Sequence, residues 1–299
     1  QNLSFSVQPG EFVTICGPSG CGKSTLLRQL KPVLAPHGRR TGEIFFEGKS
    51  LDFLDLRTQS AGIGFVQQSP DNQIVTDKVW HELAFGLESL GCDTKAIRGR
   101  VAEMANFFGI QTWFYKNVAE LSGGQKQLLN LAAIMTMQPS VLVLDEPTSQ
   151  LDPIAASDFL GTLGKINREL GTTVLITEHR LEEVLPLSDR VLVMDSGMRI
   201  ADGTPQAVGE QLREIKHTMF LAMPTAMRVW AATDSKAPCP VTVRDGRRWL
   251  AGFRDFQPVS QPPAMEETPP AAMLKNVWFK YTEDSPDVVK DLNLCVPKG

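Results

Sequence analysis

The chain has 299 residues, enough for one large domain or two ordinary ones, and 42% of them are apolar, as a packed core requires. Its 30 Lys and Arg residues are balanced by 34 Asp and Glu residues, so no basic excess is available to bind a nucleic acid. The 5 cysteines are an odd number without CxxC spacing, which argues against disulfides or a zinc site and favours a reducing, cytosolic compartment.

The first elements of the chain are a strand, a loop and a helix. The stretch EFVTICGPSGCGKSTLLRQL predicts a short apolar strand over 12–16, a Gly-rich turn, and a helix that begins near Lys23. Between residues 71 and 121 the pattern becomes helical with few strand signals, which predicts a helical subdomain inserted into a sheet.

Three further apolar runs, at 141–145, 173–177 and 190–195, lack alternation of polar and apolar residues. This is typical of parallel strands covered on both faces, and helical patterns such as 155–170 lie between them. The pattern therefore predicts an α/β fold with a mostly parallel core sheet.

The remainder of the chain is less regular. A helix is predicted over 205–223, mixed sequence follows to residue 256, and QPVSQPPAMEETPPAAM then has the composition of an extended, semi-rigid linker. The stretch 273–281 is again strand-like. The final segment LNLCVPKG resembles LSFSVQPG near the start, since Leu292, Val296 and Gly299 follow Leu3, Val7 and Gly10 at one offset (292 − 3 = 296 − 7 = 299 − 10 = 289). A repeated unit is therefore expected to begin near the end of the chain.

The stretch GPSGCGKST fits the phosphate-binding pattern G-x-x-x-x-G-K-[ST] between a predicted strand and a predicted helix. Glycines let the backbone approach phosphate oxygens and present successive N–H groups, and the helix N-terminus favours an anion. The alternative is a glycine turn that merely precedes a lysine. We expect ATP contacts from Gly17, Ser19, Gly20, Cys21, Gly22, Lys23, Ser24 and Thr25, with Lys23 on the β- and γ-phosphates and Ser24 as a ligand of Mg²⁺.

The run VLVLDEP predicts a buried strand that ends in a carboxylate. Asp145 is expected in the Mg²⁺ shell, and Glu146 follows where it can orient or deprotonate an attacking water. Hydrophobic strands that end in Asp-Glu are common, so this run narrows the possible classes of nucleotide-binding protein only together with the glycine loop.

The stretch LSGGQKQ, followed by the helical run LLNLAAIMTM, resembles the signature motif of ATP-binding cassette (ABC) ATPases. The alternative is that Ser122 simply caps a helix. The resemblance implies that Ser122, Gly123, Gly124 and Gln125 form a second anion site, which holds an ATP bound to the phosphate loop of a second, facing cassette.

The resemblance extends to other motif positions. Gln68 corresponds to the Q-loop glutamine, expected to sense Mg²⁺ and to face a transmembrane partner, although Gln67 departs from the usual aromatic. Asp152 corresponds to the D-loop, where Gln150 departs from the usual small residue. His179 corresponds to the switch histidine on the γ-phosphate. Asp145, Glu146, Gln68 and His179 are thus the expected catalytic set, with Ser24, Gln68 and Asp145 on the metal.

The family also implies a domain order. The expected parts are a first cassette over 1–210 with an antiparallel β subdomain and without its adenine-stacking start, a C-terminal extension over 211–256, a linker over 257–271, and a truncated second cassette over 272–299. Tyr281 stands where that second cassette would place its adenine-stacking aromatic.

Two looser stretches, 70–91 and 236–250, resemble the energy-coupling factor branch of the family, which energises uptake of vitamins and metal ions. The branch implies a transmembrane scaffold protein and a membrane substrate-binding protein as partners. Since no apolar run reaches the roughly 20 residues that span a bilayer, we expect a peripheral protein at the cytoplasmic face of the membrane. The alternative is a soluble tandem ABC ATPase that acts on ribosomes or DNA.

Overall fold

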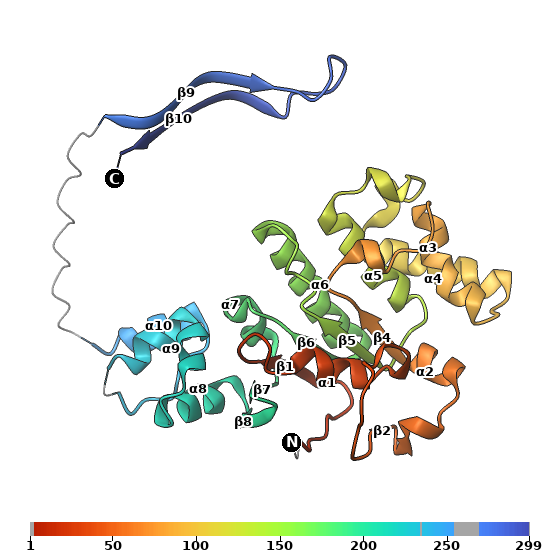
Figure 1. Ribbon diagram of the computed structural model, residues 1–299, viewed down its shortest axis with the longest axis horizontal. Helices are drawn as coiled ribbons and strands as arrows, with labels where there is room; N and C mark the ends of the chain where they lie inside the picture. The colour runs from red at the N-terminus through yellow and green to blue at the C-terminus, as the bar shows by residue number, and fades with distance from the viewer. Residues whose placement is uncertain (1–2, 234, 254–268, 299) are drawn as a thin grey trace. The chain divides into compact units, whose positions relative to one another are not determined.

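The computed structural model describes residues 3–233, 235–253 and 269–298. The chain divides into two compact units, residues 1–252 and residues 253–299, which are described separately below (Figure 1). Among the described residues, no helix combines the length and the apolar character needed to cross a bilayer.

A six-stranded sheet forms the centre of the first unit. Its spatial order is β4 (Ile63–Val66), β5 (Val141–Asp145), β6 (Thr173–Thr177), β1 (Phe12–Cys16), β7 (Arg190–Asp195) and β8 (Met198–Gly203). All pairings are parallel except that of β8 with β7. The four strands that the sequence predicts therefore pair with one another, and the prediction of a mostly parallel core sheet is confirmed.

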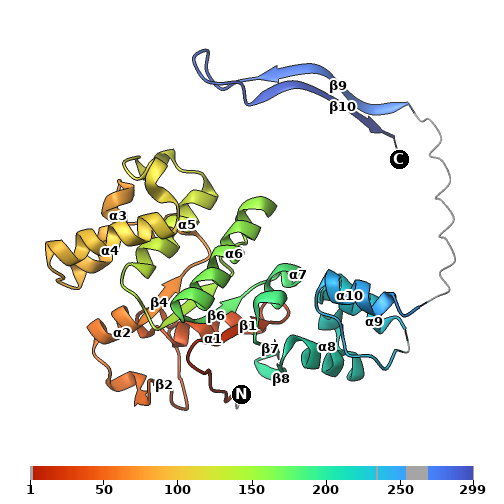
Figure 2. The same cartoon turned by 180° about the vertical axis from the view of Figure 1, so that it is seen from behind.

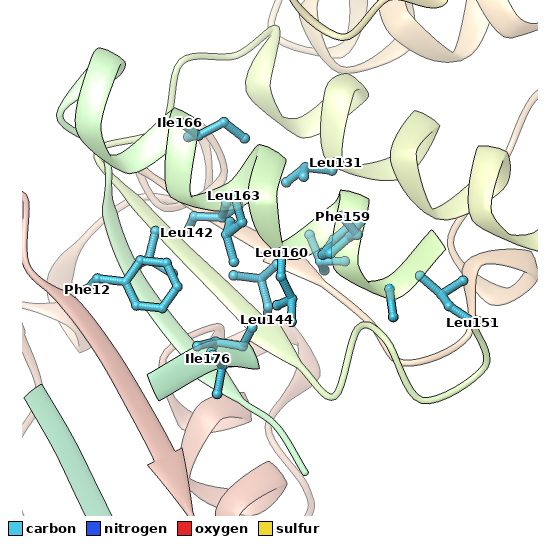
Figure 3. Close-up of a cluster of buried hydrophobic side chains, with 14 of the residues drawn as sticks. Phe12, Leu131, Leu142, Leu144, Leu151, Phe159, Leu160, Leu163, Ile166 and Ile176 are labelled. Atoms are coloured by element: carbon cyan, nitrogen blue, oxygen red, sulfur yellow. The ribbon is translucent and has the colours of Figure 1, made fainter. Parts of the chain in front are cut away.

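Helices cover both faces of this sheet, as the continuous apolar runs predict. Neighbouring side chains in a strand point to opposite faces, so Leu142 and Leu144 belong to one core cluster and Val143 to the other. On the first face α6 (Pro153–Leu170) packs through Phe159, Leu160 and Leu163 onto Phe12, Leu142, Leu144 and Ile176 (Figure 3). Each such buried Leu stabilises the fold by roughly 1.5–3 kcal/mol.

The second face is covered near the start of the chain. Leu27 of α1 (Lys23–Gln29) and Leu51 belong to the cluster of Val13 and Ile15. α2 (Leu56–Gly62) leads into β4, and α7 (Leu181–Val184) follows β6.

The predicted helical insertion lies between β4 and β5. It consists of α3 (Val79–Ser89), α4 (Thr94–Phe107) and α5 (Gly123–Met135), which form one group in both views (Figures 1 and 2). A separate antiparallel pair, β2 (Phe45–Phe46) with β3 (Lys49–Ser50), precedes the insertion. The antiparallel element that the family resemblance implies is therefore present as a short hairpin.

The prediction of a single helix over 205–223 is wrong. The helix α8 spans only Pro205–Glu214, because Lys216, two residues later, adopts a left-handed φ of 52° that cannot continue a helix. A separate 3₁₀ turn then begins after His217, whose ring accepts a hydrogen bond from the Met219 N–H at 3.1 Å. α9 (Thr225–Ala231) and α10 (Val243–Leu250) complete the unit, and α8 runs across the expected boundary at residue 210.

The second unit is an antiparallel pair of strands, β9 (Pro270–Phe279) and β10 (Val289–Pro297). The predicted strand over 273–281 thus begins three residues earlier and ends two residues earlier than expected. Residues 254–268, which include most of the expected linker over 257–271, lie outside the described residues.

Candidate functional site

The glycine loop between β1 and α1 packs closely against other backbone at its first glycine. A Cβ on Gly17 would lie 2.1 Å from the carbonyl oxygen of Met194, so no other residue fits without displacing backbone. Gly20 and Gly22 have φ values of 78° and 103°, a region that glycine enters without strain. Around both of these glycines a Cβ would meet nothing within 4 Å, so the loop faces open space there.

Lys23 is already ordered inside this loop. Its ammonium donates to the carbonyl oxygens of Gly17 at 2.9 Å and of Pro18 at 3.2 Å, and the residue is 4% exposed. Among the described residues, no hydrogen bond outside the helices uses the N–H groups of Gly22, Lys23 or Ser24. A buried ammonium and free N–H groups at one loop are the donor set that a polyphosphate requires. Cys21 is buried beside Gly17, whereas Ser19 and Thr25 are exposed.

Asp145, at the end of β5, is the acceptor at the centre of the site. Its Oδ1 accepts from the Ser24 hydroxyl at 2.7 Å and from the Thr177 hydroxyl at 3.0 Å, and the residue is 4% exposed. The Arg28 guanidinium lies 3.7 Å from Oδ2. A hydroxyl and a carboxylate oxygen in contact beside a phosphate-binding loop are hard ligands of the kind that Mg²⁺ takes, so the residues fit this ion.

Glu146 and His179 meet next to Asp145. His179 Nε2 lies 2.8 Å from Glu146 Oε1, although the two residues are 33 positions apart. Glu146 has a left-handed φ of 47°, which is uncommon for a residue with a side chain and marks stored strain. Its backbone N–H donates to the carbonyl oxygen of Thr177 at 3.1 Å and to the Thr177 hydroxyl at 3.0 Å, which holds this conformation.

Gln68 follows β4 and its side chain is exposed. The backbone beside it is held from two directions, since the Gln67 N–H donates to Gln73 at 2.9 Å and the Gln67 carbonyl accepts from Gln127 at 3.1 Å. Gln127 is fully buried and also donates to the Pro147 carbonyl at 3.0 Å. It thereby links the helix after the signature motif to the segment after Glu146.

The signature residues form the exposed start of α5. The Ser122 hydroxyl accepts from the Gln125 N–H at 3.3 Å, and the Gln125 side chain accepts from the Ser122 N–H at 3.0 Å, a reciprocal cap. The capping role that the sequence offered as an alternative is therefore present in the structure, and among the described residues no hydrogen bond outside the helix uses the N–H groups of Gly123 and Gly124. Gly123 has open space around it, whereas a Cβ on Gly124 would lie 2.9 Å from Ala155 Cβ.

Asp152 also serves as a cap. Its carboxylate accepts from the N–H groups of Ile154 and Ala155, both at 3.0 Å, at the start of α6. Within the described part of the chain, neither Ser122 nor Asp152 is joined by a hydrogen bond or ion pair to the loop from Gly17 to Thr25. Tyr281 belongs to the second unit, where it is 78% exposed and packs edge-on against Phe279.

Sequence reasoning missed the polar residues that support this site. Thr177, Glu178 and Gln127 each donate to or accept from the segments that carry Asp145, Glu146 and Gln68. Thr177 is the last residue of β6 and Glu178 follows it, and neither belongs to a motif of its own. Gln127 is the last residue of the LSGGQKQ stretch, and its place directly before the apolar run LLNLAAIMTM is the one signal that could have drawn attention to it as a buried polar side chain.

A glycine loop around a buried lysine, joined through Ser24 to a strand that ends in Asp-Glu, defines a P-loop nucleotide-binding protein. The comparisons with known proteins agree. The family profile described as ABC transporter matches residues 1–149. The chain belongs to the ABC transporter family, and this part of it is an ABC ATPase domain.

Curated relatives extend the match along the chain. A protein of Bacillus thuringiensis subsp. konkukian, named as an ABC transporter ATP-binding protein, is 42% identical over 302 residues. The match covers 100% of this chain and 54% of that protein. A Methanosarcina mazei protein with the same kind of name is 32% identical over 320 residues, again covering 54% of its length. The chain therefore spans about half the length of the curated relatives it matches.

Solved structures confirm the fold. The structure of cbiO1 from Clostridium perfringens, titled part of the ABC transporter complex cbiONQ, superposes with a TM-score of 0.65 at 32% identity and covers 76% of this chain and 90% of its own. The dimeric cassette MJ0796 bound to ADP and Pi gives a TM-score of 0.59 at 25% identity, covering 68% and 89%.

Proposed function

We propose that the chain is the ATP-hydrolysing part of an importer of the energy-coupling factor type. The observation that carries the proposal is the 2.7 Å contact between Ser24 and Asp145. It joins the loop suited to phosphates with the strand end suited to Mg²⁺, directly beside Glu146 and His179. The likeness to cbiO1, titled part of the complex cbiONQ, favours the energy-coupling branch.

In this proposal each residue has a defined task. Lys23 exchanges its two carbonyl partners for β- and γ-phosphate oxygens, while the N–H groups at the start of α1 bind the remaining oxygens. Ser24 and Asp145, with Gln68 as the third expected ligand, would hold Mg²⁺, and the ion would supply positive charge to offset that of the phosphates. Glu146 orients and deprotonates the attacking water, and His179 steadies the γ-phosphate.

A second cassette completes the site. Ser122 and Gly123 are exposed at the N-terminus of α5, and among the described residues Ser122 has no hydrogen bond to this chain's own phosphate loop, as expected if the signature meets the ATP of a facing cassette. The dimeric state of the MJ0796 cassette supports this arrangement. We propose that ATP closes the pair, that hydrolysis reopens it, and that a transmembrane scaffold protein and a membrane substrate-binding protein at the cytoplasmic face are driven by this cycle.

Nucleotide binding is tested with Lys23→Ala in the full-length protein. Calorimetric titration with ATP should show loss of binding at this half, whereas Lys95→Ala, an exposed lysine on α4, should bind as the wild type does. Micromolar affinity retained by Lys23→Ala at this half would contradict the phosphate-loop assignment.

The transport role needs a separate experiment. A tagged full-length protein should copurify with a polytopic membrane protein, and the reconstituted complex should hydrolyse ATP faster when the transported compound is present. Copurification with ribosomes or DNA, without a membrane protein, would instead favour the soluble alternative.

A further inference from the structure

Hydrogen bonds join two loops of the site at several residues. One loop follows β5 and carries Glu146, and the other follows β6 and carries His179. At one end the Glu146 N–H donates to Thr177, and at the other end the Arg180 guanidinium donates to the Leu151 carbonyl at 3.2 Å. The two loops therefore cannot move independently between these points.

The carboxylate of Glu178 forms the centre of this connection. Its Oε1 accepts from the Thr148 N–H at 3.1 Å and from the Thr148 hydroxyl at 2.7 Å, while its Oε2 accepts from the His179 N–H at 3.1 Å. Glu178 is 3% exposed and Thr148 is fully buried. A fourth and longer bond comes from the Arg180 N–H at 3.5 Å. These donors lie on two different loops, so one rigid, planar group sets the spacing between the loops.

Because Glu178 and Thr148 are buried, their hydrogen bonds fix one relative position of the two loops. A carboxylate removed from water is tolerated only where donors replace the lost hydration, and here three N–H groups, of Thr148, His179 and Arg180, and one hydroxyl do so. Any shift of the segment after Glu146 relative to His179 would break one of these bonds in a site that water does not reach. The carboxylate therefore penalises relative motion of the two loops.

The His179 ring has no comparable support of its own. Its side chain is 49% exposed, and its hydrogen bond to Glu146 joins the two groups whose relative position is in question. The ring position must therefore come from the backbone at residues 178 and 179, which Glu178 anchors to Thr148.

We propose that Glu178 is a positioning residue for the proposed hydrolysis: through Thr148 and the His179 N–H it fixes the switch histidine against Glu146. This inference rests on the proposed function. Glu178 itself touches neither phosphate nor water in this scheme. Among the described residues, Glu178 makes no hydrogen bond or ion pair with the loop that carries Lys23, so its loss should impair turnover and leave ATP binding unchanged.

The main test uses a matched pair at Thr148 in the full-length protein. Thr148→Val keeps the shape and removes the hydroxyl donor, whereas Thr148→Ser keeps the hydroxyl. Thr148→Val and Glu178→Gln should lower kcat roughly 10- to 100-fold, as expected for misplacement of a group near the chemistry. KM for ATP should stay within about twofold of the wild-type value, since uniform binding is untouched.

Turnover is counted per bound nucleotide, so that unfolded protein does not enter the comparison. Thr148→Ser and the exposed charge-matched control Glu169→Gln should behave as the wild type. The double variant Thr148→Val with Glu178→Gln should be no slower than the slower single variant, because both changes break the same connection. Wild-type kcat in both single variants, or KM and kcat that worsen together, would overturn the proposal.

A second readout does not depend on hydrolysis. The imidazole NMR signals of His179 should shift in Glu178→Gln and Thr148→Val, whereas those of His81 on α3 should stay in place. If the wild type hydrolyses no ATP but these signals shift, the proposed function fails and the positioning role stands. If His179 signals are unchanged in both variants, the positioning role fails regardless of turnover.

Discussion

His179 Nε2 and Glu146 Oε1 lie 2.8 Å apart, so the two side chains expected to act on the γ-phosphate and on the attacking water are in contact. The Glu146 side chain is 19% exposed, and among the described residues no hydrogen bond uses its other oxygen, Oε2, which could accept from a water. The acceptor needed for general base catalysis is therefore present and held in place.

Replacing the Glu146 carboxylate should impair ATP hydrolysis while leaving ATP binding intact. We expect Glu146→Gln to bind ATP and to slow hydrolysis by roughly 10²- to 10⁴-fold, because an amide cannot take the proton. Phosphate release measures turnover, and sedimentation with ATP detects the trapped, closed pair. Glu169→Gln serves as the control, and unchanged turnover in Glu146→Gln would remove this residue from the base role.

A methyl group added at Gly17 should destabilise the protein. The new Cβ would lie 2.1 Å from the Met194 carbonyl, and neither strand can yield because Cys16 is paired with Val193 between β1 and β7. We expect Gly17→Ala to lower the free energy of unfolding by roughly 3 kcal/mol or more. Urea denaturation followed by circular dichroism measures the change.

The matched control is Gly161→Ala inside α6, where a Cβ meets nothing within 4 Å. This variant should be more stable than the wild type by about 0.5–1 kcal/mol, since alanine favours a helix. Equal urea midpoints for Gly17→Ala and the wild type would show that the close approach to Met194 is wrong.

The ion pair between Arg190 and Asp202 should make stability depend on pH. The Arg190 guanidinium donates to both oxygens of Asp202, at 2.6 and 2.8 Å, and holds the pKa of that carboxyl below its usual range. A lowered pKa in the folded state gives stability that is present above the unfolded value of about 3.9 and is lost as pH falls through the folded value.

Asp202→Asn should therefore cost roughly 1–2 kcal/mol at pH 7, as loss of a hydrogen-bonded charged pair does. The difference from the wild type should shrink once the pH falls below about 4. Urea midpoints at pH 7 and pH 3 test this, with the exposed Asp158→Asn on α6 as control. A difference of the same size at both pH values would contradict the prediction.

The cysteines should differ sharply in reactivity. Burial raises the pKa of the Cys16 and Cys239 thiols to about 12, so almost no thiolate exists there at pH 8. Cys295 is exposed. We expect Ellman's reagent to modify Cys295 first in native protein, and Cys295→Ser to abolish that first phase. Modification of Cys16 without denaturant would show that the core opens beside the phosphate loop.

Much of the fold could be predicted because its signals are local. The runs at 12–16 and 141–145 are strands in the structure, since nearly continuous apolar segments of this kind are stable only when both faces are covered. The prediction of one helix over 205–223 was wrong because the left-handed backbone conformation of Lys216 ends α8. No pattern in the surrounding apolar and charged residues marks that position.

The residues of the candidate site also fall into two groups, those that a local motif predicts and those that only the fold brings together. Gly17, Lys23 and Ser24 could be predicted from the spacing of the glycine loop and Asp145 from the apolar strand before it, and the structure brings Ser24 and Asp145 into contact. Glu178 was missed because its partner Thr148 lies 30 residues earlier, and only the pairing of β5 with β6 brings the two together. Supporting residues of this kind have no local signal.

The hydrogen bonds of Lys23 to the carbonyls of its own loop also affect the thermodynamics of nucleotide binding. A free lysine side chain loses up to about 2 kcal/mol of rotamer entropy when it is fixed. Here the two carbonyl partners have already fixed it, during folding. If Lys23 binds phosphate as proposed, it exchanges one set of acceptors for another, so the entropic penalty of ordering this lysine belongs to folding and does not reduce nucleotide affinity.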